Sequence, residues 1–141
     1  MLDKDDFLDI INIKGKENYM KKSIFTYCII WVAVIAWFWI MYNNINPIDY
    51  SIFVFYLILP LATIICSAKA VVSGCSFKGV IFGLLFMGFA YSAAYHFTFN
   101  LANMIAFDKI NPFIISFVFV GALIALIGFI IGWIIRLFRV R

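Results

Sequence analysis

Four long stretches of the chain contain no charged residue and few polar ones. They cover residues 23–48, 50–68, 79–107 and 110–135 and hold 26, 19, 29 and 26 residues. A helix needs roughly 20 apolar residues to cross about 30 Å of hydrocarbon, and each stretch is about that long. Inside lipid every backbone amide must be hydrogen-bonded within the protein, which leaves helices or a closed barrel. The alternation of polar and apolar residues that marks barrel strands is absent here, so the pattern predicts helices.

We therefore expect an all-α fold, an integral membrane four-helix bundle in which neighbouring helices are antiparallel. The transmembrane domain covers 23–141, with expected spans at 23–42, 51–71, 79–104 and 112–136. Pro47 and Pro112 fall in the first and third connections, where the residue before proline is pushed out of helical geometry. The connections are short, so they leave no room for a separate soluble domain.

The segment 1–22 precedes these stretches and carries most of the acidic residues of the chain. Its apolar residues recur in a loosely helical spacing, and Gly15 offers a place for a helix to stop. Two interpretations stay open: a cytoplasmic amphipathic helix that lies on the membrane surface, or a partly ordered tail.

Basic residues are distributed very unevenly between the two sides of the predicted bundle. Only Lys109 falls on one side; the other side holds Lys4, Lys14, Lys16, Lys21, Lys22, Lys69, Lys78, Arg136, Arg139 and Arg141. Short cytoplasmic loops carry the excess of Lys and Arg in membrane proteins. We therefore expect both termini in the cytoplasm, in a bacterial inner membrane or another plasma membrane.

Composition narrows the class of protein further. Hydrophobic residues make up 66% of the 141 positions and charged residues only 13%, against about 45–50% and about 25% in soluble domains, which excludes a soluble enzyme. The net charge of +4 fits membrane topology and contact with lipid, so we expect no nucleic-acid partner. Three cysteines and one histidine without ligand-like spacing predict neither a metal site nor a cofactor.

The third span carries a polar stripe, the candidate polar face. Ser92, His96, Asn100 and Asn103 recur at intervals of four, four and three residues, and Tyr95 borders them. At 3.6 residues per turn they share one face, which should look into the bundle or a wet cleft because polar groups are costly in lipid. His96 has two interpretations: an imidazole that relays protons or binds a ligand, or a neutral side chain that hydrogen-bonds to another helix.

Small residues form a second pattern, the candidate helix-packing stripes. The third span contributes Gly79 and Gly83; the fourth contributes Gly121, Ala125, Gly128 and Gly132. Small residues let helix backbones approach closely in lipid. We expect the third and fourth spans to pack on each other through these stripes; the alternative is a surface for a partner or for self-association. In the second span, Pro60 predicts a kink.

Residues that carry membrane chemistry are absent from the four stretches. They contain no carboxylate for ion coupling, no glycine-flanked nucleophile, no paired histidines and no phosphate-binding loop, so we expect no catalytic site and no enzyme. In size, four spans and inward termini the chain resembles, in topology, the membrane-embedded immunity proteins that protect bacteria from pore-forming bacteriocins.

These observations favour a protein that acts through helix–helix contacts, as an accessory, assembly or immunity-type factor. Its partners would be the lipid bilayer and either another membrane protein or a second copy. The alternative is a small channel or transporter with Ser92, His96 and Asn100 on its pore face.

Overall fold

A computed structural model describes the backbone of residues 4–44 and 46–139 and the side chains of residues 21–44 and 46–139. All regular structure in these ranges is helical, and no strand occurs in them. The elements, in chain order, are α1 (Lys4–Met41), α2 (Pro47–Tyr50), the π-helix η1 (Ser51–Ile58), α3 (Leu59–Val72), α4 (Phe77–Tyr95), the π-helix η2 (His96–Asn100), α5 (Leu101–Phe107) and α6 (Ile115–Arg139).

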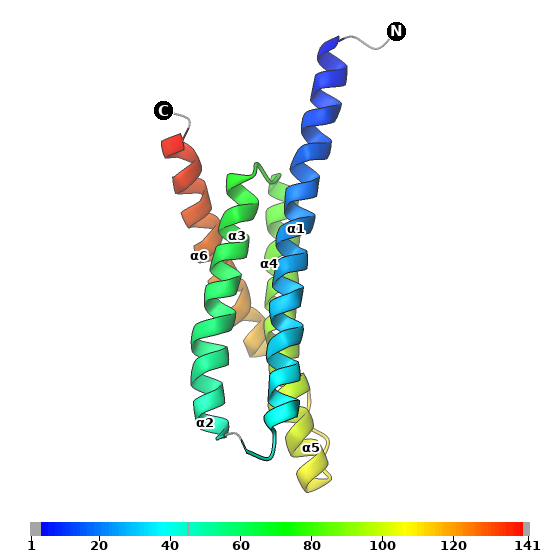
Figure 1. Ribbon diagram of the computed structural model, residues 1–141, viewed down its shortest axis with the longest axis vertical. Coiled ribbons are helices and arrows are strands. Elements are labelled where there is room, and N and C mark those ends of the chain that lie inside the picture. Colours follow the sequence, from blue (N-terminus) through cyan, green and yellow to red (C-terminus); the bar gives the residue numbers. More distant parts are fainter. Residues whose placement is uncertain (1–3, 45, 140–141) are drawn as a thin grey trace.

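The elements join into four rods that are long and apolar enough to cross a membrane. The rods are Lys21–Met41, Pro47–Val72, Phe77–Phe107 and Ile115–Arg139. They alternate in direction, so the described beginning of α1 and the described end of α6 lie at the same end of the molecule (Figure 1). The prediction of an all-helical fold with four such helices is confirmed, and it fits a multi-pass membrane protein.

Several helix boundaries differ from those expected. The second rod begins at Pro47 instead of 51, so Pro47 starts a helix and does not lie in the connection, and the third rod ends at Phe107 instead of 104. The first helix runs from Lys4 through Gly15 without a break, so the expected stop at Gly15 is wrong. A single glycine inside a helix costs only about 1 kcal/mol relative to alanine, less than a helix end in which backbone groups lose their partners. The last helix begins at Ile115 instead of 112, because residues 109–114, around Pro112, have no helical structure.

The two ends of the bundle differ in the charged side chains that they carry. One end, here called the basic end, has Lys21, Lys22, Lys69, Lys78, Arg136 and Arg139; the other, the far end, has Asp49, Asp108 and Lys109. The basic end also holds the turn Ser73–Ser76, where Gly74 takes a φ of 87° and the N–H of Cys75 donates to the Ala70 carbonyl. This is the glycine-dependent turn that often ends helices, and it sends α4 back antiparallel to α3.

Helix α6 packs against both α3 and α4, whereas α3 and α4 touch each other little. In Figure 1 it crosses obliquely behind them. A Cβ built on Gly121 would lie 2.6 Å from Tyr91 Cβ in α4, and one on Gly128 would lie 2.6 Å from the Ile64 carbonyl oxygen in α3. Glycine at these positions therefore permits the closest approach of α6 to its two neighbours.

The interior consists of two clusters stacked along the bundle. The cluster toward the far end is rich in aromatic rings, and Phe38 packs edge-on against Tyr50 with ring centroids 5.0 Å apart. The cluster toward the basic end is built around Tyr27, which is fully buried, and reaches Ala125 and Phe129 of α6. Such edge-to-face aromatic pairs add to the stability gained from burial alone.

Pro60 shapes the second rod by removing a hydrogen-bond donor. The backbone before it is π-helical, and the N–H of Leu59 donates to Val54, five residues back. In this register residue 60 would donate to the Phe55 carbonyl, but proline has no N–H. The hydroxyl of Tyr91 in α4 donates to that carbonyl instead. A π-helical adjustment and a neighbouring helix thus compensate for the proline, as is common in membrane helices.

This arrangement predicts that the cost of Tyr91→Phe depends on Pro60. In the native background the Phe55 carbonyl loses its donor, and we expect the free energy of unfolding to fall by about 1 kcal/mol, which lies between the average of about 0.6 and the maximum of about 1.7 kcal/mol for hydrogen bonds between membrane helices. In a Pro60→Ala background residue 60 regains an N–H, so the same change should cost less than half as much. Unfolding of the four variants of this double-mutant cycle in detergent measures the difference.

The matched control is Tyr95→Phe, because the Tyr95 hydroxyl has no hydrogen-bond partner among residues 21–44 and 46–139. This change should leave the free energy of unfolding unaltered in both backgrounds. Equal losses for Tyr91→Phe with and without Pro60 would contradict the assignment.

Candidate functional site

The candidate polar face lies on α4, η2 and α5 and is directed at the segment that returns the chain to α6. Ser92 is almost fully buried, and its hydroxyl donates to the Ile114 carbonyl over 2.8 Å. One turn further on, Tyr95 stacks on Phe117 of α6, with ring centroids 4.5 Å apart and planes 28° apart. Ser92 therefore contacts the chain just before α6, and Tyr95 contacts the beginning of α6.

Asn100 links His96 to the same returning segment. Its amide nitrogen lies 3.2 Å from the Pro112 carbonyl oxygen and 3.3 Å from His96 Nδ1. A carbonyl oxygen only accepts, so the atom that faces Pro112 must be the amide nitrogen, which donates. The same nitrogen faces His96 Nδ1, which links the imidazole to this amide. Asn103 is exposed and takes no part in this network.

The returning segment explains why polar residues are needed at this place. The chain turns at Asp108, which has a φ of 49°, and runs without helical structure from Lys109 to Ile114. Backbone groups outside a helix need other partners, because unpaired ones are costly away from water. Asn100 supplies a donor to the Pro112 carbonyl, and Ser92 gives the Ile114 carbonyl a second donor beside the N–H of Phe117. His96 packs on the Phe113 ring with centroids 5.7 Å apart. The polar stripe thus fastens a connection inside the chain.

The candidate helix-packing stripes also meet partners within the chain. Gly121 faces α4, whereas Gly132 and Gly128 face α3, and Ala125 between them is fully buried. The stripe of α6 therefore divides between two helices instead of serving only the third span.

The stripe of the third span is used at two separate points. A Cβ on Gly83 would lie 2.8 Å from the end of the Phe129 ring, so the glycine makes room for that ring. Gly79 lies in the first turn of α4, where its N–H donates to the hydroxyl of Ser76, which caps the helix.

One groove in the surface between α1 and α4 is lined by apolar atoms alone. It has a volume of about 360 Å³. Aromatic rings of Trp31, Phe86, Phe89 and Phe113 form its walls, and Ala90 and Ala93 contribute to its floor. The indole of Trp31 uses its one N–H in a 2.7 Å bond to the Ala90 carbonyl.

This groove was not predicted from the sequence. Its residues come from three separate segments, and each alone looks like an ordinary lipid-facing residue. One feature of the sequence could have indicated the groove. Ala90 and Ala93 are three residues apart and have phenylalanines on either side, so small side chains lie beside large ones on one face of the helix.

The thiols and the other side chains that could bind a metal are spread along the bundle in the part of the chain that the structure describes. No group of three His, Cys, Asp or Glu side chains able to hold a metal ion occurs there. Cys28, Cys66 and Cys75 form no disulfide. Burial raises the pKa of the Cys75 thiol in the Ser73–Ser76 turn, which lowers its thiolate fraction and hence its reactivity.

Comparisons with known proteins returned no match among protein-family models, curated proteins or solved structures.

The role of Asn100 is testable by replacing it with leucine. Asn100→Leu removes both bonds of the amide, each worth about 0.6 kcal/mol on average. We expect backbone amides between residues 109 and 114 to exchange with solvent about three to ten times faster in detergent. Hydrogen-exchange mass spectrometry measures this rate.

Asn103→Leu is the matched control, since Asn103 is exposed and three residues away on the same stripe. It should leave the exchange of this segment unchanged. Equal acceleration by the two substitutions would show that Asn100 does not fasten the returning segment.

Proposed function

We propose that this protein acts without catalysis, through helix–helix contacts with another membrane protein. It would serve as an accessory, assembly or immunity-type factor in a bacterial inner membrane, with both termini in the cytoplasm. The observation that carries the proposal is the apolar groove between α1 and α4, because it is a shaped surface that the chain itself leaves unfilled.

The chemistry of the groove indicates the kind of partner. Its exposed lining has no polar atom, so a partner segment gains nothing there from charge or hydrogen bonds and must itself be apolar. Rings of Trp31, Phe86 and Phe89 give firm walls, while Ala90 and Ala93 allow a close approach to the backbone of α4. Transmembrane helices associate through such close packing.

Other candidate surfaces are occupied within the chain. The glycines of α6 are packed against α3 and α4, and Ser92 and Asn100 are hydrogen-bonded to the returning segment. Moreover, no buried side-chain nitrogen or oxygen lacks a partner among the described residues. These contacts favour a surface role over a reaction centre or a wet path through the bundle.

The channel alternative places Ser92, His96 and Asn100 on a pore. Proton or solute flux into liposomes that carry the purified chain, lost on His96→Ala with the fold intact, would support it. Because Ser92 and Asn100 are hydrogen-bonded to the returning segment, we expect no such flux.

Photocrosslinking in native membranes tests the proposal. A photoreactive amino acid replaces Phe89, which lines the groove and is 57% exposed, or Leu123, which lies on α6 and is 61% exposed. We expect a protein adduct of defined mass from position 89 only, and we expect Ala93→Phe, which fills the groove, to reduce it at least fivefold.

Adducts with lipid alone at both positions would overturn the proposal. An adduct of twice the mass of the chain would show that the partner is a second copy of this protein and not a different membrane protein.

A further inference from the structure

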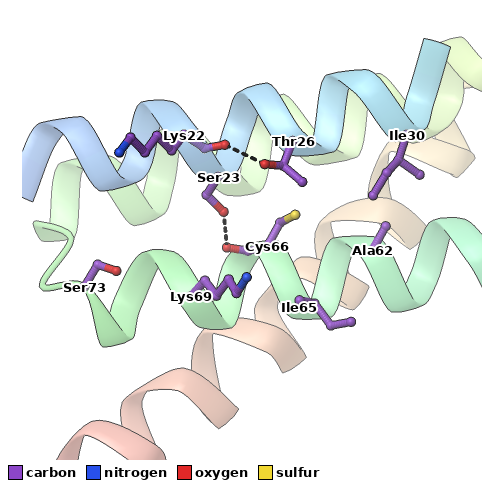
Figure 2. A pocket seen from close by; sticks show the side chains of 9 residues that line it. All are labelled: Lys22, Ser23, Thr26, Ile30, Ala62, Ile65, Cys66, Lys69 and Ser73. Atoms are coloured by element: carbon purple, nitrogen blue, oxygen red, sulfur yellow. Dashed lines mark hydrogen bonds between the residues drawn. The ribbon is translucent and has the colours of Figure 1, made fainter. Parts of the chain in front are cut away.

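A second groove lies between α1 and α3 at the basic end, and Figure 2 shows its lining. It has a volume of about 390 Å³. Two contacts build it: the Ser23 hydroxyl of α1 donates to the Cys66 carbonyl of α3 over 2.7 Å, and the Thr26 hydroxyl donates to the Lys22 carbonyl over 2.9 Å. The first bond holds the two helices at a fixed spacing, so the groove belongs to the packed structure.

Both walls of the groove change from charged to apolar in the same direction. On α1 the lining residues are Lys22, Thr26 and Ile30, spaced by four, and on α3 they are Lys69, Ile65 and Ala62. Residues three or four apart share a helix face. At 1.5 Å per residue, each wall passes from an ammonium group to aliphatic side chains within about 12 Å.

Among residues 21–44 and 46–139, no carboxylate neutralises the charge at the mouth of the groove. Lys22 and Lys69 are exposed, one on each wall, and neither forms an ion pair with a carboxylate among residues 21–44 and 46–139. The carboxylates of Asp49 and Asp108 lie at the far end of the bundle. An anion at this end of the groove would have one lysine on each wall and no carboxylate among these residues to repel it.

We propose that this groove binds one anionic phospholipid from the leaflet at the basic end. The phosphate lies between Lys22 and Lys69, and an acyl chain follows Thr26 and Ile30 on one wall and Ile65 on the other. A free phosphate would use only the charged mouth, whereas a phospholipid matches the whole gradient from charge to hydrocarbon. Basic pockets between membrane helices are a known setting for anionic headgroups.

The site is independent of the proposed partner contact, because it lies between α1 and α3 and shares no lining residue with the groove between α1 and α4. Failure of one proposal therefore leaves the other untouched.

Native mass spectrometry of the full chain in detergent tests the site, with phosphatidylglycerol and phosphatidylcholine as probes. We expect one phosphatidylglycerol to be retained about tenfold more tightly than phosphatidylcholine. Each lysine near a membrane surface contributes about a fivefold change in affinity for anionic lipid. Lys22→Gln and Lys69→Gln should each reduce the affinity for phosphatidylglycerol about fivefold, and the double variant should reduce it more than tenfold.

Lys78→Gln is the matched control, because it removes the same charge at the same end of the bundle but outside the groove. It should retain wild-type binding. Ile65→Trp tests the apolar part, since the larger ring fills the groove without changing charge, and it should also reduce phosphatidylglycerol binding. All variants change exposed side chains, so their unfolding midpoints should match that of the wild type.

A third arm separates the lipid from its headgroup. Millimolar inorganic phosphate should leave the bound phosphatidylglycerol in place. Displacement by phosphate, equal retention of the two lipids, or equal losses for Lys78→Gln and the double lysine variant would overturn the proposal.

Discussion

The structure depends on one constraint: a polar side chain or an irregular stretch of backbone inside the bundle must find its hydrogen-bond partners within the protein. Side chains of one helix repeatedly donate to main-chain carbonyls of another part of the chain. The pairs are Ser23 with Cys66, Trp31 with Ala90, Trp39 with Phe97, Tyr50 with Val34, Tyr91 with Phe55, Ser92 with Ile114 and Asn100 with Pro112. The carbonyls of Cys66, Ala90, Val34 and Phe97 lie inside helices, so these four bonds satisfy the side-chain donors. The bonds to Phe55 and Pro112 supply donors where the backbone is irregular, and in a bilayer no water could replace either kind of partner.

The same constraint organises the surfaces that remain for function. Irregular backbone occurs before Pro60 and between Asp108 and Ile114, and polar side chains of α4 and η2 are used at both places. The small residues of α6 are used for close packing on α3 and α4. Among the surfaces left over are two grooves beside α1, one apolar and one that changes from basic to apolar, and both proposals concern these grooves.

The sequence predicted the helical class and four membrane-length helices, because the absence of charge over 19 to 29 residues leaves few other structures. It also grouped Ser92, His96 and Asn100 on one face, because helical periodicity alone determines that. It did not predict their partners, since main-chain carbonyls of Pro112 and Ile114 leave no signature in side-chain identity. The division of the α6 glycines between two helices follows from the crossing angle of α6, which spacing alone does not specify.

The lysines illustrate the same limit. Lys22 and Lys69 both fit the rule for topology, but they are far apart in sequence, and only the packing of α1 on α3 brings them to one groove. The continuous helix through Gly15 was not predicted either, because the cost of one glycine is small beside the gain from uninterrupted hydrogen bonding.

The most direct test of the account is the accessibility of the two connections that flank the third rod. Cys28, Cys66 and Cys75 are replaced, a single cysteine is placed at Lys78 or at Lys109, and cells with an intact inner membrane are treated with a membrane-impermeant maleimide. The account predicts that the cysteine at 109 reacts at once and that the cysteine at 78 reacts only after permeabilisation. Labelling of both positions in intact cells, or of 78 alone, would contradict a chain that crosses the bilayer four times with its basic end in the cytoplasm.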